Sequence, residues 1–151
     1  MYLHAAIHWL VMRACNTLSW NAKVKRGNLS PWLLTALSKT MSGITSHVLD
    51  TSRGVPGANI EVQLELKKDN EWKKIGGGVT NKDGRLPDPL VEELVAGHYR
   101  IVFLVADYFS DLKKPSFFPR VRIEFLVDDP MEHYHVPLLL SPFGYSTYRG
   151  S

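Results

Sequence analysis

The sequence is almost without cysteine, and this absence excludes two kinds of structure. Cys15 is the single cysteine among 151 residues. A disulfide within one chain is therefore impossible, and a metal site built on several cysteines is excluded as well. The fold must depend on an ordinary hydrophobic core, and 44% hydrophobic residues over this length are enough for one domain.

Acidic residues are missing from the first 49 positions. That stretch holds five basic residues, which are Arg13, Lys23, Lys25, Arg26 and Lys39. Without these five, the 18 Lys and Arg of the chain fall to 13, against 15 Asp and Glu. The net charge of +3 therefore belongs to the N-terminal segment and not to the rest of the chain. We expect no nucleic-acid partner, because a basic face is what such proteins require.

Long hydrophobic runs are absent too, which excludes a transmembrane helix and predicts no membrane partner. Near the N-terminus, His8 and Arg13 interrupt the apolar residues, and no basic residue precedes them as in a secretory signal. We expect residues 1–40 to be a poorly ordered extension, either a leader, a transit-like segment or an over-extended gene start. The domain then spans residues 41–151. We expect a cytoplasmic protein, with organellar targeting by residues 1–40 as the alternative.

Beyond residue 41, apolar and polar residues alternate with the period of a β-strand. The positions expected to face the core are Ile60, Val62, Leu64 and Leu66 in one run, and Tyr99, Ile101, Phe103, Val105, Val121, Ile123, Phe125 and Val127 in two others. Turns rich in Gly, Pro, Asn and Asp separate the runs, as in an antiparallel sandwich or barrel. A short helix is expected at ADYFSDLKK before Pro115, and a bulge or strand end at IGGG.

Ionisable side chains lie on the outward faces of several predicted strands. In HYHVPLLL, the core face takes Tyr134, Val136, Leu138 and Leu140, which leaves His133, His135, Pro137 and Leu139 on the opposite face. The same alternation turns His47 outward beside Thr45 and Leu49, and places Gly144, Ser146 and Tyr148 on one face. Imidazoles, a phenol and leucines on outward faces predict a second buried surface, supplied by another subunit.

Several motifs resemble one known family. SHVLDTSRGVPGANIEV, TNKDGRLPDPL, GHYRIVF, FFPRVRIEF and EHYHVPLLLSPFGYSTYRGS are together similar to the transthyretin-related proteins that act as 5-hydroxyisourate hydrolases in purine breakdown. The resemblance spans residues 42–151. Its most specific element is the final YRGS, which hormone-carrying transthyretin lacks. The resemblance implies an all-β, transthyretin-like sandwich of about eight strands in two sheets with one short helix, assembled as a homotetramer with a channel between dimers.

The resemblance also implies a set of site residues. In that family four neighbouring strands each supply one key side chain, and these fall here on His47, Arg85, His135 and Tyr148, with Ser151 nearby. The implied catalytic residues are His47, His135 and Ser151, and the implied substrate-binding residues are His47, Arg85 and Tyr148. Adjacent strands lie about 4.8 Å apart, so side chains on three or four of them can surround a purine-sized substrate.

The chemistry follows from the side chains. Opening the six-membered ring of 5-hydroxyisourate adds water to a carbonyl and breaks the neighbouring C–N bond, which needs no cofactor. Histidine is the side chain best suited to accept a proton from water near neutral pH, and either His47 or His135 can be this base. Arg85 offers a permanently charged fork for the carbonyl oxygens. Tyr148 would position the ring, and Ser151 would close the site and order the water.

Three alternatives have to be weighed. His47, His133 and His135 could form a three-histidine zinc site, although no acidic partner for the histidines is evident. A carrier of thyroid-hormone-type ligands is a second possibility, but His47, His135 and Tyr148 would narrow and polarise its channel. A catalytically silent scaffold is a third, and it would require loss of the motif residues, none of which is lost. The sequence therefore favours a hydrolase that needs no metal.

Overall fold

The computed structural model describes residues 43–86, 90–91 and 93–150, so the predicted extension 1–40 lies outside the described residues. One helix and ten strand segments are found in this part of the chain. They are β1 (Gly43–Thr45), β2 (Val48–Asp50), β3 (Val55–Pro56), β4 (Glu61–Lys68), β5 (Glu71–Val79), β6 (Gly97–Leu104), α3 (Ala106–Asp111), β7 (Val121–Val127), β8 (His133–His135), β9 (Leu138–Ser141) and β10 (Gly144–Thr147). The short helix at residues 106–111 confirms the sequence prediction.

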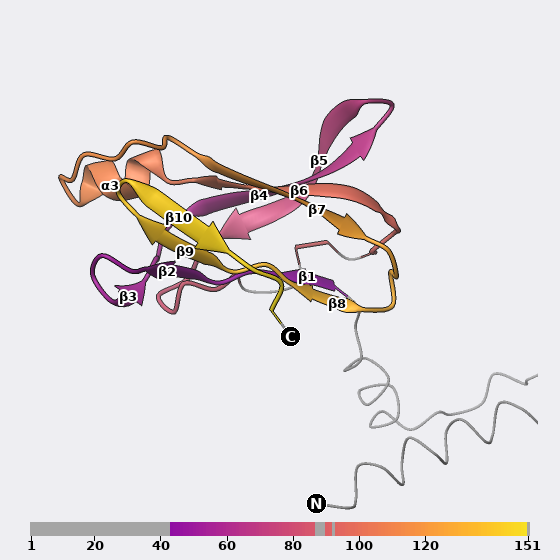
Figure 1. Ribbon diagram of the computed structural model, residues 1–151, viewed down its shortest axis with the longest axis horizontal. Helices are drawn as coiled ribbons and strands as arrows, with labels where there is room; N and C mark the ends of the chain where they lie inside the picture. The colour runs from indigo at the N-terminus through magenta and orange to yellow at the C-terminus, as the bar shows by residue number, and fades with distance from the viewer. Residues whose placement is uncertain (1–42, 87–89, 92, 151) are drawn as a thin grey trace, which may run out of the picture. The chain divides into compact units, whose positions relative to one another are not determined.

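The strands form two layers, as Figure 1 shows. One layer is the sheet β5-β4-β6-β7, in which every neighbouring pair is antiparallel. The other contains the sheet β10-β9-β2-β3 and the pair β1-β8. Helix α3 lies at one end of the sandwich, between β6 and β7 in the chain. The all-β sandwich expected from the alternation is confirmed.

Two short interruptions divide strands that are otherwise continuous. Pro137, between β8 and β9, has no N–H to donate to a sheet. Hydrogen bonds from Val136 N to Thr45 O and from Leu138 N to His47 O, 2.9 and 2.8 Å long, bridge the interruption. Ser46 fills the corresponding position between β1 and β2, and its buried hydroxyl donates to the carbonyl of Val136 at 2.8 Å. Joined in this way, the ten described segments amount to the eight strands expected.

One pairing differs from the purely antiparallel arrangement that the sequence suggested. The strand β1-β2 runs parallel to β8-β9, with Thr45 opposite His135 and Leu49 opposite Leu139. Alternation of side chains reports which face is buried but not the direction of the neighbouring strand. Hairpins join antiparallel neighbours, whereas these two strands are separated by most of the domain, so no turn fixes their relative direction. The parallel pair is central to the candidate site.

The core lies between the layers and consists of the residues that the alternation predicted. Ile60, Leu64, Tyr99, Ile101, Phe103, Val105 and Leu138 are completely buried. Ile123 and Phe125 are only partly buried, because β7 is an edge strand of its sheet. The pairing of β4 with β5 shifts register between Leu64 and Glu65, which leaves Ile75 as the extra residue. The bulge expected at IGGG is therefore confirmed.

A buried carboxylate, Asp50, closes the turn after β2. It accepts hydrogen bonds from Ser52 Oγ at 2.6 Å, from the backbone N–H groups of Ser52 and Arg53, and from Tyr108 Oη at 2.8 Å. Burial alone would raise the pKa of Asp50, but these four bonds outweigh it and hold the pKa below the ordinary value of 3.8. The charged form of Asp50 is therefore the one that stabilises the fold.

Replacing Asp50 by Ala should lower the free energy of unfolding at pH 7 by about 2 to 4 kcal/mol, since buried donors lose a charged partner. A carboxylate with a lowered pKa in the folded state contributes stability above its unfolded pKa, and that stability is lost as pH falls through the folded pKa. The difference between wild type and Asp50→Ala should therefore shrink below pH 4 or so. Urea unfolding at pH 7 and pH 3 measures it, and an equal difference at both values would contradict the explanation.

Candidate functional site

The site is built on the outward face of the parallel strand pair. His47 sits at the interruption between β1 and β2, and its backbone pairs on one side with Arg85 in an antiparallel bridge. On the other side the His47 carbonyl accepts from Leu138 N at 2.8 Å. His47 is half-buried between the buried residues Ser46 and Val48. The alternation predicted this outward orientation, and the structure agrees.

A tight turn at residues 81–85 places Arg85 beside His47. Asn81 Oδ1 accepts from the N–H groups of Asp83 and Arg85 at 2.9 and 3.0 Å, and Gly84 adopts φ +71°. A side chain at Gly84 would also clash, because its Cβ would lie 2.3 Å from the carbonyl oxygen of Val48. Glycine therefore allows the NKDGR turn to press against β2. Arg85 follows directly and is exposed.

His135 lies half-buried on the outward face of β8. Thr45 lies opposite it on β1, and Thr45 Oγ1 is 3.0 Å from His135 Nδ1 and 2.9 Å from His133 Nε2. Burial lowers the pKa of His135 from its ordinary value of 6.5, and the charges of Arg85, His133 and His47 lower it further. His135 is therefore neutral at pH 7 and able to accept a proton.

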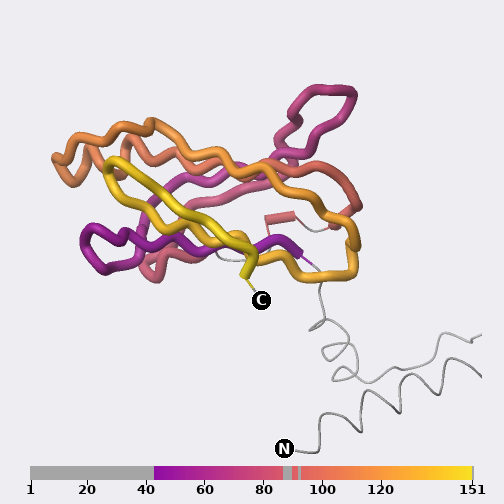
Figure 2. The backbone as a smooth tube through the Cα atoms, viewed as in Figure 1, coloured from indigo at the N-terminus to yellow at the C-terminus, as the bar shows by residue number. Residues whose placement is uncertain are grey.

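The segment after β10 passes along the free side of His135. Gly150 N donates to His135 O at 2.8 Å and pairs with it in an antiparallel bridge. A Cβ on Gly150 would lie 2.5 Å from His135 Cδ2, so only glycine lets the segment approach the imidazole so closely. The backbone tube in Figure 2 shows this segment, in yellow, crossing the layer that holds β1 and β8.

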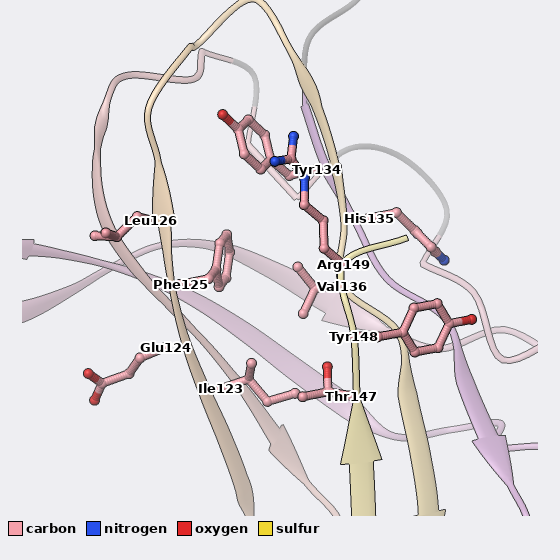
Figure 3. Close-up of a pocket in the computed structure, with 10 residues that line it drawn as sticks. All are labelled: Ile123, Glu124, Phe125, Leu126, Tyr134, His135, Val136, Thr147, Tyr148 and Arg149. Carbon is pink, nitrogen blue, oxygen red and sulfur yellow. The ribbon is translucent and has the colours of Figure 1, made fainter. Parts of the chain in front are cut away.

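Neighbouring side chains of this segment point in different directions, as Figure 3 shows. Tyr148 and His135 project to the same side of the chain, whereas Arg149 extends toward Tyr134. Arg149 lies over the Tyr134 ring at 5.1 Å and forms an ion pair with Glu132 at 2.6 Å. Because this ion pair is exposed, it adds little stability, but it ties the segment to β8 and the turn before it.

A cavity of about 240 Å³ lies on the other side of His135 and Tyr148, between β7 and the C-terminal segment. Its walls are mainly apolar and include Ile123, Phe125 and Val136. His135 and Tyr148 line it as well, but the imidazole of His135 and the hydroxyl of Tyr148 point away from these apolar side chains (Figure 3). His47 and Arg85 do not line this cavity, so it is not the place where the predicted site residues meet.

The predicted site residues can now be placed. His47, Arg85 and His135 lie on adjoining segments of one layer, and Tyr148 lies beside His135 on the segment bound to its other side. Tyr148 is 57% exposed, so one chain leaves it open to solvent. Ser151 lies outside the described residues. The structure thus describes the positions of four of the five predicted site residues. Their chemical roles stay predictions.

Two residues of the site, Thr45 and Gly150, were not predicted from the sequence. Thr45 entered only as a neighbour of His47, yet its hydroxyl contacts two imidazoles. Gly150 belongs to the quoted YRGS but was given no role, and it touches the face of His135. The two-residue spacing of Thr45 and His47 could have revealed the first, because both lie on one strand face. The path of the chain after β10 carried no comparable signal.

The described residues contain no group of three or more His, Cys, Asp or Glu that could hold a metal ion. The zinc alternative needed His47, His133 and His135 together. Instead, His133 Nε2 and His135 Nδ1 both lie within hydrogen-bond distance of Thr45 Oγ1. Within the same part of the chain, no helix is long and apolar enough to cross a membrane.

Comparison with known proteins places this site in context. The model of the HIUase/Transthyretin family matches residues 44–150. The chain is 45% identical to a 5-hydroxyisourate hydrolase of Salmonella typhi over 117 residues, which cover 77% of this chain and 86% of the relative.

Two solved structures are similar as well. A Klebsiella pneumoniae 5-hydroxyisourate hydrolase superposes with a TM-score of 0.64 at 34% identity, covering 73% of this chain and all of the other. Sea bream transthyretin in complex with thyroxine gives a TM-score of 0.67 at 29% identity, covering 71% and 93%. The same fold thus occurs in a 5-hydroxyisourate hydrolase and in a transthyretin in complex with thyroxine, so the function has to be argued from the residues of the site.

Proposed function

This chain belongs to the HIUase/transthyretin family, and from that premise we propose that it is a hydrolase that opens the six-membered ring of 5-hydroxyisourate. Water forms a C–O bond to a ring carbonyl, the neighbouring C–N bond breaks, and the departing nitrogen takes up a proton. The product is 2-oxo-4-hydroxy-4-carboxy-5-ureidoimidazoline, in the degradation of urate. The observation that carries the proposal is the meeting of His47, Arg85 and His135 on the outward face of the parallel pair.

We assign the proton-accepting role to His135. Its lowered pKa keeps the imidazole neutral at pH 7, and its Nδ1 is held by Thr45, which leaves Nε2 for the substrate side. A positioned general base contributes about 10²- to 10⁴-fold to the rate. His47, on the neighbouring strand, then orients the substrate or the attacking water. The proton taken by His135 Nε2 returns to the departing nitrogen, so the step is balanced.

The remaining residues bind the substrate. The guanidinium of Arg85 has a planar set of donors that suits carbonyl oxygens and stabilises negative charge developing on the attacked one. Tyr148 presents its ring on the same side as His135 (Figure 3) and would stack against or hydrogen-bond the flat substrate. Ser151 is proposed to close the site and to order the water. No cofactor is needed for these steps.

The alternative function is the binding of a small ligand of the thyroid-hormone type, as in the sea bream relative. Such a carrier would offer an apolar channel. Here the outward face instead presents two histidines and an arginine, and the Coulombic effect of Arg85 and His47 on the pKa of His135 reflects their proximity. Removing these three charged or ionisable groups from water for an apolar ligand would be costly. The hydrolase is therefore the better supported function.

We further propose that the protein is a homotetramer in the cytoplasm. The outward face carries the half-buried Leu49 and Leu139 directly opposite each other, beside Ser146. Apolar side chains next to catalytic ones suit a face that a second subunit covers. That subunit would also enclose Tyr148, which a single chain leaves exposed. Light scattering of the purified protein should give four times the mass of one chain.

The proposed function is tested by following the substrate directly. Oxidation of urate generates 5-hydroxyisourate in the cuvette, and its ultraviolet absorbance then decays. Adding the protein should accelerate this decay in proportion to protein concentration. A rate equal to that with an unrelated protein would refute the function. Calorimetry with thyroxine tests the alternative function, which requires that thyroxine binds while the decay of 5-hydroxyisourate is not accelerated.

The pH dependence of kcat/KM should reflect His135. Its folded pKa lies below 6.5, so more than half of the imidazole is neutral at pH 6.5 and the protonated form predominates only at lower pH. The acid limb of the profile should therefore have its midpoint below pH 6.5, since kcat/KM reports groups of the free enzyme. A midpoint clearly above pH 6.5 would contradict the assignment of His135 as the base.

A further inference from the structure

The hydroxyl of Thr45 lies between two imidazoles, and the proposed reaction does not by itself explain that arrangement. Thr45 Oγ1 is 3.0 Å from Nδ1 of the half-buried His135 and 2.9 Å from Nε2 of the exposed His133. Parallel pairing of β1 with β8 fixes the geometry, because it sets Gly43 opposite His133 and Thr45 opposite His135. The three side chains thus form a continuous line from the enclosed side of the site to solvent.

A hydroxyl has one proton to donate and can accept two hydrogen bonds. Thr45 can therefore donate to only one of the two imidazoles at a time, and it accepts from the other. When it donates to His133, it accepts from His135 Nδ1–H, and His135 Nε2 is left free to act as a base. When Thr45 donates to His135 Nδ1, it accepts a hydrogen bond from His133 Nε2–H. The ring proton of neutral His135 is then on Nε2, which cannot act as a base. The direction of two hydrogen bonds thus selects the form of His135.

The proposed reaction places a positive charge on His135 for part of each turnover. The carboxylic acid of the product, with a pKa of about 3.5, releases its own proton to water. The proton that His135 Nε2 takes from the attacking water instead stays in the site until the departing nitrogen accepts it. Burial and the charges of Arg85, His133 and His47 disfavour the protonated form of His135, so a group that shares this proton would assist the reaction.

We propose that Thr45 is a positioning residue that orients the ring of His135 and links it to His133, which shares the proton taken from water. When His135 Nε2 takes that proton, Nδ1–H passes its proton to Thr45 Oγ1 while the Thr45 proton moves to His133 Nε2, so that the positive charge rests on the exposed His133. When His135 Nε2–H gives its proton to the departing nitrogen, the other two protons move back, so that Nε2 is free for the next turnover and no other reactant is needed. This inference rests on the proposed hydrolase function and adds a proton path to it.

The test compares Thr45→Val, which keeps the shape, with Thr45→Ser, which keeps the hydroxyl. Thr45→Val should lower kcat by about 10-fold or more, with little change in KM, and shift the acid limb of the pH profile. Residues that orient metal-bound histidines have effects of about 10- to 100-fold, and we expect an effect of the same size for the orientation of His135. Thr45→Ser should stay within about 3-fold of wild type. Thr51→Val is the matched control, because Thr51 Oγ1 bonds only a carbonyl, that of Leu140, at 3.0 Å.

The link to His133 is tested separately with His133→Gln, an exposed substitution that should not affect folding. Its kcat should fall at low buffer concentration and recover when imidazole buffer is added, while wild type stays insensitive to buffer. Wild-type kcat in Thr45→Val, or a His133→Gln enzyme whose kcat is independent of buffer, would overturn the proposal. Should Thr45→Val fail to fold by circular dichroism, the His133→Gln result decides. If wild type itself does not accelerate the decay, the hydrolase function fails and not merely the proton path.

Discussion

Replacing His47 or His135 by Asn should cut turnover of 5-hydroxyisourate by at least ~100-fold, which is the loss expected when a general base or its positioned partner is removed. Asparagine keeps a planar polar side chain of similar width but cannot take up a proton near neutral pH. Both histidines are half-buried on the outward face and outside the core, so the fold should persist. Steady-state ultraviolet assays measure the loss, and light scattering and circular dichroism check the assembly.

His98→Asn provides the matched control for these two variants. His98 lies on the other layer, in β6, where its ring contacts Trp72 edge-on at 5.1 Å and its Nε2 is 3.3 Å from Glu124. Its replacement should leave turnover within about 2-fold of wild type, because surface substitutions away from a site have small effects. Near-normal turnover in His47→Asn or His135→Asn would contradict the assigned roles.

Deleting residues 148–151 should also reduce turnover by at least ~100-fold, comparable with the loss of a general base. The deletion removes Tyr148 and the hydrogen bond from Gly150 N to His135 O, which is 2.8 Å long. Strand β10 ends at Thr147 and its pairing with β9 is complete without these residues, so the sandwich should remain folded. Unchanged circular dichroism with lost turnover would support a role of this segment in the site alone.

Gly150→Ala tests the same segment with a single methyl group. That methyl would lie 2.5 Å from His135 Cδ2 and 3.1 Å from Cγ, so either the imidazole or the segment must move. A displacement of about 1 Å in a catalytic group can cost about 100-fold. Gly144→Ala is the matched control, because the nearest atom to its methyl is Ser141 Oγ at 3.6 Å, an ordinary contact. Equal turnover in the two variants would show that the segment does not position His135.

Much of the fold could be predicted from alternation alone. Ile60, Leu64 and Phe103 are buried as expected, because the strand period of two determines which face meets the core. The same rule turned His47 and His135 outward. It could not reveal that β1 runs parallel to β8, since strand direction depends on the path of the chain between them. That parallel register is what places Thr45 beside His135.

The candidate site was predictable only in part for a related physical reason. The resemblance named His47, Arg85, His135 and Tyr148, and the turn and bridge that bring Arg85 to His47 became visible only with the three-dimensional structure. Arg149 and Gly150 belong to a segment whose contacts are long-range and depend on where it crosses β8. A local sequence pattern cannot predict such long-range contacts, and Thr45 and Gly150 were therefore identified only by their distances to His135.

A crystal structure of the protein with bound urate gives the most direct test of whether these groups enclose the substrate. Urate is the flat parent of 5-hydroxyisourate and does not undergo the ring opening. We predict that its ring lies within contact distance, about 4 Å, of the side chains of His47, Arg85 and His135, with Tyr148 beside it. Urate bound instead in the apolar cavity next to Phe125, with both histidines free of contact, would contradict the proposed site.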